Sequence, residues 1–215
     1  QIRRGYLLQA AELYRTREKA GASYNSRTGH IKGIDVQKSS LQGLGNVLVA
    51  LGDTQAAKEA YEEALVHAES LVVLEPSNST RRQRGVAITL YSIAKILRNN
   101  EPRLAIDKLN QAVDISRSVM SIQATHARRP RDLALMLVLR GEIHVQHGID
   151  VQAGLDDCKE AAKMLTRRAI ESPRELTSQQ DLEEHLTLIA DTLEQANQLN
   201  AGSEILASTI NQLEC

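Results

Sequence analysis

The residues best suited to chemistry are two histidines and a cysteine. His144 and His147 lie three positions apart, which places them on one side of a helix, and Cys158 lies in the next helical segment. A zinc site needs four ligands, or three ligands and a water molecule, and no fourth ligand is close in the sequence. We therefore predict a packed histidine near an interface between repeats. Cys158 is predicted to be a buried small residue rather than a nucleophile.

Six arginines form two triplets with the same internal spacing. They are Arg81, Arg82 and Arg84 and, 47 residues later, Arg128, Arg129 and Arg131. Such a basic ridge would suit an acidic protein segment, a phosphate or a nucleic acid, although no interleaved aromatic residues favour stacking of single-stranded bases. The alternatives are that each arginine pairs with a carboxylate of the adjacent repeat, or that the triplet is inherited by duplication.

Sequence motifs of enzymes do not occur in the chain. It has no nucleophile-elbow, Walker, dinucleotide-binding or zincin motif, and it lacks the glycine-rich loop and the His-Arg-Asp and Asp-Phe-Gly sequences of kinases. The acidic pairs Glu62-Glu63, Asp156-Asp157 and Glu183-Glu184 fall in helical segments, where a solvated face is the ordinary explanation. We expect neither enzymatic activity nor a cofactor from this chain.

Composition narrows the fold class and the kind of partner. Phe and Trp are absent and five tyrosines supply all the aromatic side chains, so the core must be built from Leu, Ile, Val and Ala, which suits closely packed helices. A net charge of -1 gives no global reason to expect a nucleic acid or an anionic membrane as partner. No apolar run approaches the roughly 20 residues of a membrane span. Two cysteines are too few for a disulfide framework, and a cytoplasmic protein is expected.

A helical pattern recurs along the chain with a period of 47 to 49 residues. Its first helix carries three apolar residues and one small residue, as in Leu41, Leu44, Gly45 and Leu48. Equivalent segments start at Leu90, Leu137 and Leu186, and the third copy is degraded because Arg140 and His144 occupy apolar positions. Neither helix of a unit could bury its apolar stripe alone, so successive units must stack.

The second helix of each unit follows a break that contains Gly or Asn, residues that tolerate a helix end. The breaks are Gly52-Asp53, Asn99-Asn100, Gly148 and Asn200 with Gly202. The helix itself carries small residues around one larger one, as in Ala57, Tyr61 and Ala64. Ala10 and Tyr14 match this pattern 47 residues earlier, so the chain begins inside a repeat at Gln1 and is expected to be part of a longer protein.

The pattern of Leu41, Leu44, Gly45, Leu48, Ala57, Tyr61 and Ala64 resembles the tetratricopeptide repeat, whose usual length is 34 residues. The longer unit, with LVVLEPSNSTRRQRGVAITLYSIAKIL at 71–97, is similar to repeats in the non-catalytic regions of bacterial multidomain signalling proteins. The resemblance implies an all-α fold, a right-handed α-solenoid of antiparallel helix pairs with about nine helices. It also implies one repeat domain over residues 1–215, with an incomplete repeat at 1–33 and repeats at about 34–77, 78–127, 128–177 and 178–215.

Repeats of this family bind partners on a concave face, and the resemblance carries its groove positions over to this chain. These positions are Gln42, Asn46, Tyr91, Lys95, Arg98, Glu142, Asp191 and Glu194. Their side chains would point away from the second helix of each unit. Their charge changes along the chain from neutral or basic in the early repeats to acidic in the last repeat, and such a gradient could orient an extended peptide. Ordinary polar surface is the alternative. The basic positions of the family's carboxylate clamp are not filled in register, so we predict no such clamp.

The leading hypothesis is therefore a scaffold or regulatory module that binds a peptide or protein segment on its concave face, within a signalling protein. A second hypothesis is a sensor of a small ligand or anion, with the arginine triplets as its site. A third is a structural spacer or homo-oligomerisation module. Membrane insertion is not expected, and a nucleic-acid partner is disfavoured.

Overall fold

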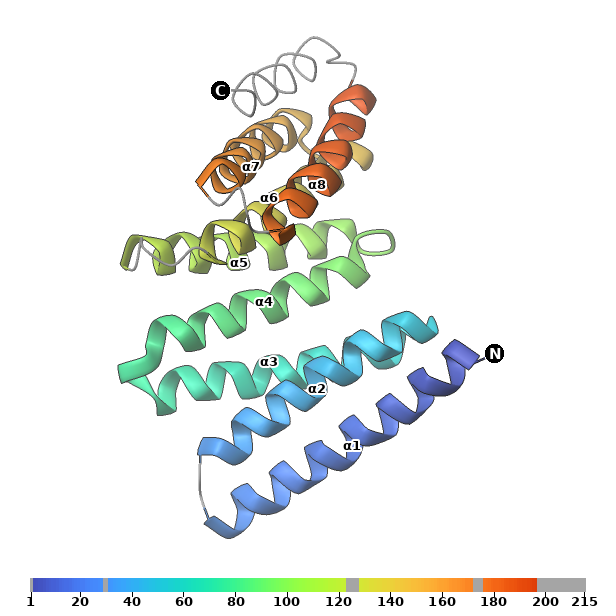
Figure 1. Ribbon diagram of the computed structural model, residues 1–215, viewed down its shortest axis with the longest axis vertical. Coiled ribbons are helices and arrows are strands. Elements are labelled where there is room, and N and C mark those ends of the chain that lie inside the picture. Colours follow the sequence, from blue (N-terminus) through green and yellow to red (C-terminus); the bar gives the residue numbers. More distant parts are fainter. Residues whose placement is uncertain (1, 29–30, 123–127, 172–175, 197–215) are drawn as a thin grey trace. The chain divides into compact units, whose positions relative to one another are not determined.

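The protein is all-helical over the residues that the computed structural model describes, which are 2–28, 31–122, 128–171 and 176–196. These residues form eight α-helices and one short 3-10 turn and contain no strand (Figure 1). The elements are α1 (Ile2–Thr28), α2 (Ile31–Leu51), α3 (Thr54–Leu74), η1 (Pro76–Asn78), α4 (Ser79–Leu97), α5 (Pro102–Ile122), α6 (Arg128–Gln146), α7 (Val151–Glu171) and α8 (Leu176–Gln195). This confirms the predicted all-α class of paired, repeated helices.

The chain divides into two compact units, residues Gln1–Ile96 and Leu97–Cys215, with the boundary at the end of α4. We describe each unit by itself. The single repeat domain stays a prediction, and the ninth helix expected near Ser203 lies outside the described residues.

In the first unit, α1 packs on α2 and α2 packs on α3. The turn between α2 and α3 has the chemistry that the sequence predicts. Gly52 adopts a left-handed conformation with φ of +84°, which an L side chain rarely tolerates. The Asp53 carboxylate then accepts a hydrogen bond of 3.1 Å from the Ala56 amide and so caps α3.

Tyrosines lie against glycines at both helix contacts of the first unit. A Cβ atom added at Gly45 would come within 2.4 Å of the Tyr61 ring, and one added at Gly43 would come equally close to the Tyr14 ring. The rings therefore occupy the space that a side chain on α2 would need. Tyr14 and Tyr61 are 47 residues apart, so tyrosines at equivalent repeat positions pack on α2 from its two neighbours along the chain, α1 and α3.

Side-chain hydrogen bonds connect α2 to α4 in the same unit. The Gln42 amide donates to the Ser92 hydroxyl at 3.4 Å, and the Gln42 carbonyl oxygen accepts from the Thr89 hydroxyl at 3.3 Å. Both helices are the first of their repeat units, so this contact joins successive repeats.

The second unit repeats this arrangement. α5 packs on α6, α6 on α7, and α8 contacts both α6 and α7. Gly148, at the end of α6, has φ of +57°, and the Asp150 carboxylate caps α7 by accepting from the Ala153 amide at 3.0 Å. The predicted break at Gly148 is thus confirmed.

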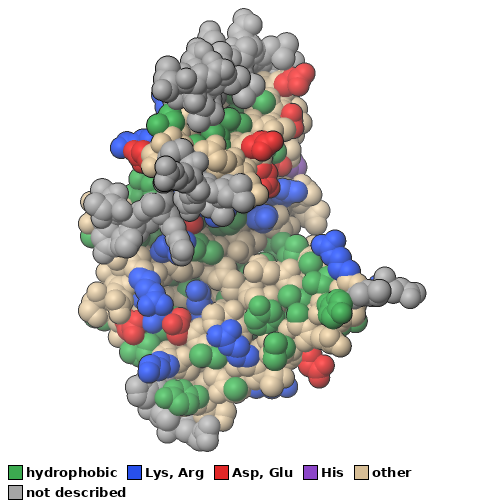
Figure 2. All heavy atoms as spheres, in the orientation of Figure 1, with side chains coloured by type: hydrophobic (Ala, Val, Ile, Leu, Met, Phe, Trp, Pro, Cys, Tyr) green, Lys and Arg blue, Asp and Glu red, His purple; other side chains and the backbone are tan. Residues whose placement is uncertain are grey.

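No helix in the described part of the chain is long and apolar enough to cross a membrane. On the face seen in Figure 2, hydrophobic, basic and acidic side chains are interspersed over the described residues.

Candidate functional site

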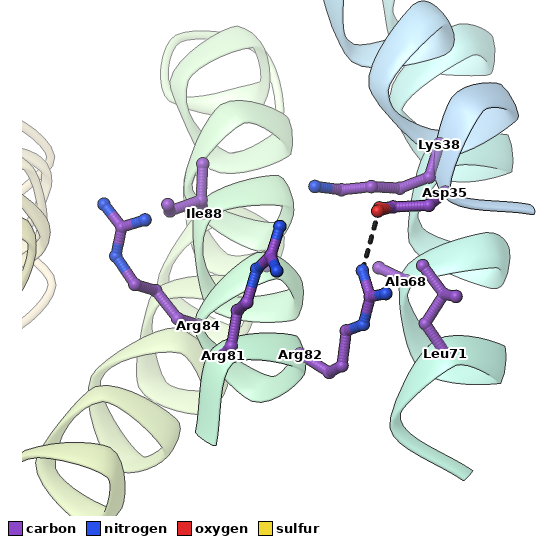
Figure 3. A pocket seen from close by; sticks show the side chains of 9 residues that line it. Asp35, Lys38, Ala68, Leu71, Arg81, Arg82, Arg84 and Ile88 are labelled. Carbon is purple, nitrogen blue, oxygen red and sulfur yellow. Dashed lines mark ion pairs between the residues drawn. The ribbon is translucent and has the colours of Figure 1, made fainter. Parts of the chain in front are cut away.

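A pocket of about 220 Å³ lies in the first unit, where α2, α3 and α4 meet (Figure 3). Four cationic side chains and a single carboxylate line it, together with a few small or apolar residues. The lining consists of Asp35, Lys38, Ala68, Leu71, Arg81, Arg82, Arg84, Gly85 and Ile88. A chain with almost no net charge therefore concentrates positive charge at one point.

Helical periodicity brings these side chains together from three elements. Asp35 and Lys38 are three residues apart on α2 and so share one face of the helix. The arginines belong to the first two turns of α4, which begins directly after the single turn opened by Pro76. Ala68 and Leu71 of α3 are almost completely buried and supply an apolar wall.

Arg82 is the structural centre of the pocket. Its Nη1 lies 2.8 Å from Asp35 Oδ1 on α2, and its Nε and Nη2 each lie 2.6 Å from Glu75 Oε2, at the C-terminal end of α3. The side chain is only 10% exposed. Burial disfavours its charged form, but the hydrogen bonds that it donates to Glu75 and Asp35 outweigh this and raise the pKa of Arg82. For this arginine, pairing with nearby carboxylates is the correct interpretation.

Lys38 is the unusual group in the pocket. A Cβ atom added at Gly85 would lie 3.5 Å from its Nζ, so the lysine reaches across to the backbone of α4. None of the residues that the structure describes forms an ion pair or a hydrogen bond with its ammonium group. The pKa of Lys38 is lowered, first by burial and then by repulsion from the three arginines, and Asp35 offsets this only in part.

The remaining two arginines of the first triplet lie differently. Arg81 is exposed, and Figure 3 shows its end in the space between α2 and α4, where the end of Lys38 also lies. The Arg84 side chain is half-buried and extends on the side away from Asp35 (Figure 3). Arg81 forms no ion pair or hydrogen bond with any described residue. Lys38 and Arg81 therefore face the pocket with N–H donors that no described residue accepts.

The second triplet gives a less complete picture. Arg131 is half-buried in α6, while Arg128 and Arg129 lie in the first turn of that helix with side chains outside the described set. A basic ridge made of both triplets therefore stays a prediction.

The groove residues predicted in the first unit take part in helix packing. Gln42 binds Thr89 and Ser92 as described above. Asn46 Oδ1 accepts a 2.6 Å hydrogen bond from the Tyr61 hydroxyl of α3, although it was expected to point away from the second helix of its repeat. The Tyr61 ring extends past Gly45 and so brings its hydroxyl within reach. Lys95 is exposed, with Nζ 5.9 Å from the centre of the Tyr91 ring.

The groove residues predicted in the second unit divide into buried and exposed positions. Glu142, whose side chain is only 8% exposed, lies 3.6 Å from Arg98 Nη1 and accepts a 3.1 Å hydrogen bond from the Gln146 amide. Asp191 and Glu194 are exposed on α8. Glu142 is thus an interior polar group rather than a surface position.

His144 and Cys158, which the sequence offered as possible metal ligands, lie in a buried contact between α6 and α7. His144 and Cys158 are both buried, as predicted, and burial is the main cause that lowers the pKa of His144. Burial, with Asp157 and Glu142 nearby, raises the pKa of Cys158 to about 12. Among the described residues, no group of three or more His, Cys, Asp or Glu side chains is arranged to hold a metal ion.

An ion pair explains the degraded third copy of the repeat. Arg140 donates from Nε and Nη2 to the two carboxylate oxygens of Asp157, both at 2.7 Å, and from Nη1 to Asn110 Oδ1 at 2.8 Å. The arginine and the aspartate side chains are 15% and 8% exposed. The prediction of a solvated face for the Asp156-Asp157 pair is therefore wrong for Asp157, because Arg140 neutralises the carboxylate inside the contact.

Three members of the basic pocket were not identified from the sequence. Asp35 and Lys38 of the lining stand in no motif and are more than 40 residues from the arginines that they meet, and Glu75, seven residues before its partner Arg82, stands in no motif either. The only sequence signal was the arginine triplet itself, and it does not indicate which residues of α2 lie opposite.

Comparisons with known proteins inform the fold rather than the site. No family model matches the chain, and no curated protein matches it. Among solved structures, the crystal structure of BtubC (BKLC) from P. vanneervenii is similar with a TM-score of 0.50 and 11% identity, over 97% of this chain and 91% of that one. A structure titled DHF119 filament aligns with a TM-score of 0.37 and 14% identity, over 91% of this chain and 98% of that one. The likeness to BtubC supports the helical-repeat architecture.

Proposed function

We propose that the chain is a non-catalytic recognition module and that its first unit binds an anionic group in the pocket between α2, α3 and α4. The observation that carries this proposal is Lys38, a half-buried ammonium group that forms no ion pair with any described residue and lines the pocket together with three arginines. Keeping like charges close in a partly desolvated site is unfavourable, and a bound anion would relieve this.

The pocket also fits the hypotheses that the sequence raises. Capture of a protein segment and detection of an anion converge there, since an acidic side chain of a peptide is itself an anionic ligand. Charge-assisted hydrogen bonds from Lys and Arg to an oxyanion are among the stronger polar contacts. Arg82, held by two carboxylates, fixes α4 against α2 and α3, so the site is formed before the ligand arrives.

Thermal unfolding in the presence of anions tests the proposal. We expect sulfate or phosphate to raise Tm of the full chain in a saturable way at constant ionic strength, since a ligand at 100 times its Kd stabilises by about 2.7 kcal/mol. Lys38→Met should abolish the saturable part, because it removes the unpaired ammonium group. Lys32→Met removes an exposed lysine from the same helix and should leave the response unchanged.

The opposite outcome is equally clear. If both variants and the wild type respond identically, the anions act on the protein surface in general, and the pocket is not a binding site.

A further inference from the structure

We propose that the anion is a phosphate monoester in its dianionic form, such as a phosphorylated serine or threonine side chain; this rests on the proposed anion-binding function and names its ligand class. The inference is carried by the number, direction and spacing of donors in the pocket.

The charge balance favours a dianion. Arg82 is already shared between Asp35 and Glu75. Lys38 and Arg81 remain, and neither has an ion pair with a described residue. A single carboxylate would neutralise one of these two cations, whereas a phosphate monoester carries a charge of about -1.5 to -2 near pH 7 and neutralises both.

The directions of the donors favour a tetrahedral group. Lys38 approaches from α2 and Arg81 from α4, so the ligand must accept hydrogen bonds from two sides at once (Figure 3). A phosphate ester offers three acceptor oxygens that point in different directions. A carboxylate is planar and is best matched by the fork of one guanidinium group. The Nε and Nη2 donors of Arg82 are already bound to the Glu75 carboxylate, so they are not available to a carboxylate ligand.

The dimensions favour a phosphoryl group over a larger ligand. The pocket of about 220 Å³ is smaller than the roughly 300–1,000 Å³ of sites for drug-sized molecules. It has space for a phosphate and a short ester linkage. Gly85 keeps the space beside Lys38 open, and Ala68, Leu71 and Ile88 provide an apolar wall for the carbon atoms next to the ester oxygen.

Binding measurements with matched probes test the inference on the full chain. Isothermal titration would compare a five-residue peptide with a central phosphoserine, the same peptide with glutamate or with serine, and glycerol phosphate. We expect phosphate-bearing probes to bind at least about tenfold more tightly than the glutamate peptide, because a charge-assisted hydrogen bond is worth roughly that factor or more. The serine peptide should not bind.

The variants assign the binding to the pocket. Lys38→Met and Arg81→Gln should each weaken phosphoserine binding by roughly ten- to a hundredfold, whereas Lys38→Arg should retain most of it. Arg103→Gln, an exposed arginine in the first turn of α5, serves as the charge-matched control and should bind as the wild type does.

Each outcome has one meaning. Tighter binding of the peptide than of glycerol phosphate identifies a protein as the source of the phosphate, and the reverse order identifies a small ester; both support the inference. Equal affinity for the glutamate and phosphoserine peptides would overturn it while leaving the anion-binding function intact. If no probe binds and sulfate does not stabilise the chain either, the proposed function fails as well.

Discussion

Two helix contacts at equivalent repeat positions are held together by different chemistry. Where α2 meets α3, Gly45 makes room for the Tyr61 ring, whose hydroxyl binds Asn46. Where α6 meets α7, Gly141 lies against Cys158 and the backbone of Gly154. An added Cβ at Gly141 would be 2.8 Å from both Cys158 Sγ and the Gly154 carbonyl oxygen. We call these the tyrosine seam and the ion-pair seam, since Arg140 and Asp157 span the second.

The comparison separates what the repeat requires from what it allows. A glycine on the first helix is common to both seams: Gly45 makes room for the Tyr61 ring, and Gly141 lets the backbone of α7 approach closely. Leu44 and Ala60 of the tyrosine seam correspond in sequence to Arg140 and Asp157 of the ion-pair seam. The ion-pair seam thus has a charged pair in exchange for an apolar pair, and we expect each charge to be tolerated only with the other.

The largest loss of stability should come from removing one partner of the Arg140–Asp157 ion pair. Asp157→Ala leaves the Arg140 guanidinium in the contact without its carboxylate, and we expect a loss of about 3–5 kcal/mol in the free energy of unfolding. The double change Arg140→Leu with Asp157→Ala installs the residues of the tyrosine seam and should restore most of this loss. Urea denaturation followed by circular dichroism measures both. A double variant no more stable than Asp157→Ala would contradict the equivalence of the two seams.

The second largest effect should come from the glycines. Gly141→Ala places a Cβ against the backbone of α7, which cannot move aside without shifting the helix, and overpacking of this kind costs about 1–3 kcal/mol. Gly45→Ala meets only atoms of the Tyr61 side chain, so we expect it to cost less. The order of the two denaturation midpoints checks this, and a reversed order would show that the ring is the more rigid neighbour.

A smaller effect is expected from the polar end of the tyrosine seam. Tyr61→Phe removes the 2.6 Å hydrogen bond to Asn46 and keeps the ring in place, which should cost about 0.5–1.5 kcal/mol. Tyr6→Phe is the control, since Tyr6 is 69% exposed and should change stability little. Equal midpoints for the two variants would mean that the Asn46 contact adds nothing to stability.

The smallest effect on stability near neutral pH should come from the protons of the Tyr61 hydroxyl and the Cys158 thiol, and the two seams should depend on pH in the same way. Tyr61 and Cys158 occupy equivalent positions, and burial raises the pKa of each to about 12. Because the folded state holds these protons more tightly than the unfolded state, their contribution to stability is complete below about pH 9. It should be lost as the pH rises toward 12.

Thiol chemistry checks the cysteine directly. In a Cys215→Ser background, Cys158 at pH 8 should react with a thiol reagent about a thousandfold more slowly than a free cysteine, until denaturant is added. Rapid labelling of the folded chain would show that α7 does not shield this thiol.

Much of the fold was predictable from the spacing of small and apolar residues. The helix breaks at Gly52 and Gly148 occur where the sequence predicts them, and both glycines have positive φ angles. These features are local, since they depend on residues within one or two helical turns of each other.

The site residues were predictable only in part. The first arginine triplet was recognised, but its three members have three roles: Arg82 pairs with two carboxylates, Arg81 is exposed at the pocket, and Arg84 extends to another side. Gln42, Asn46 and Glu142 were assigned to a binding groove and instead form hydrogen bonds within the protein. A position on a helix is periodic, whereas its hydrogen-bond partner is set by a neighbouring helix.

By itself, the sequence determined the helices, their pairing and the period at which they recur, because helix formation and amphipathic packing depend on residues three and four apart. Only the tertiary structure decided which charges meet. Lys38 faces the arginines of α4, and Arg140 pairs with Asp157, because stacking brings together side chains that are 17 to 46 residues apart in the chain. Electrostatic interactions act through space, and no periodicity along the chain records them.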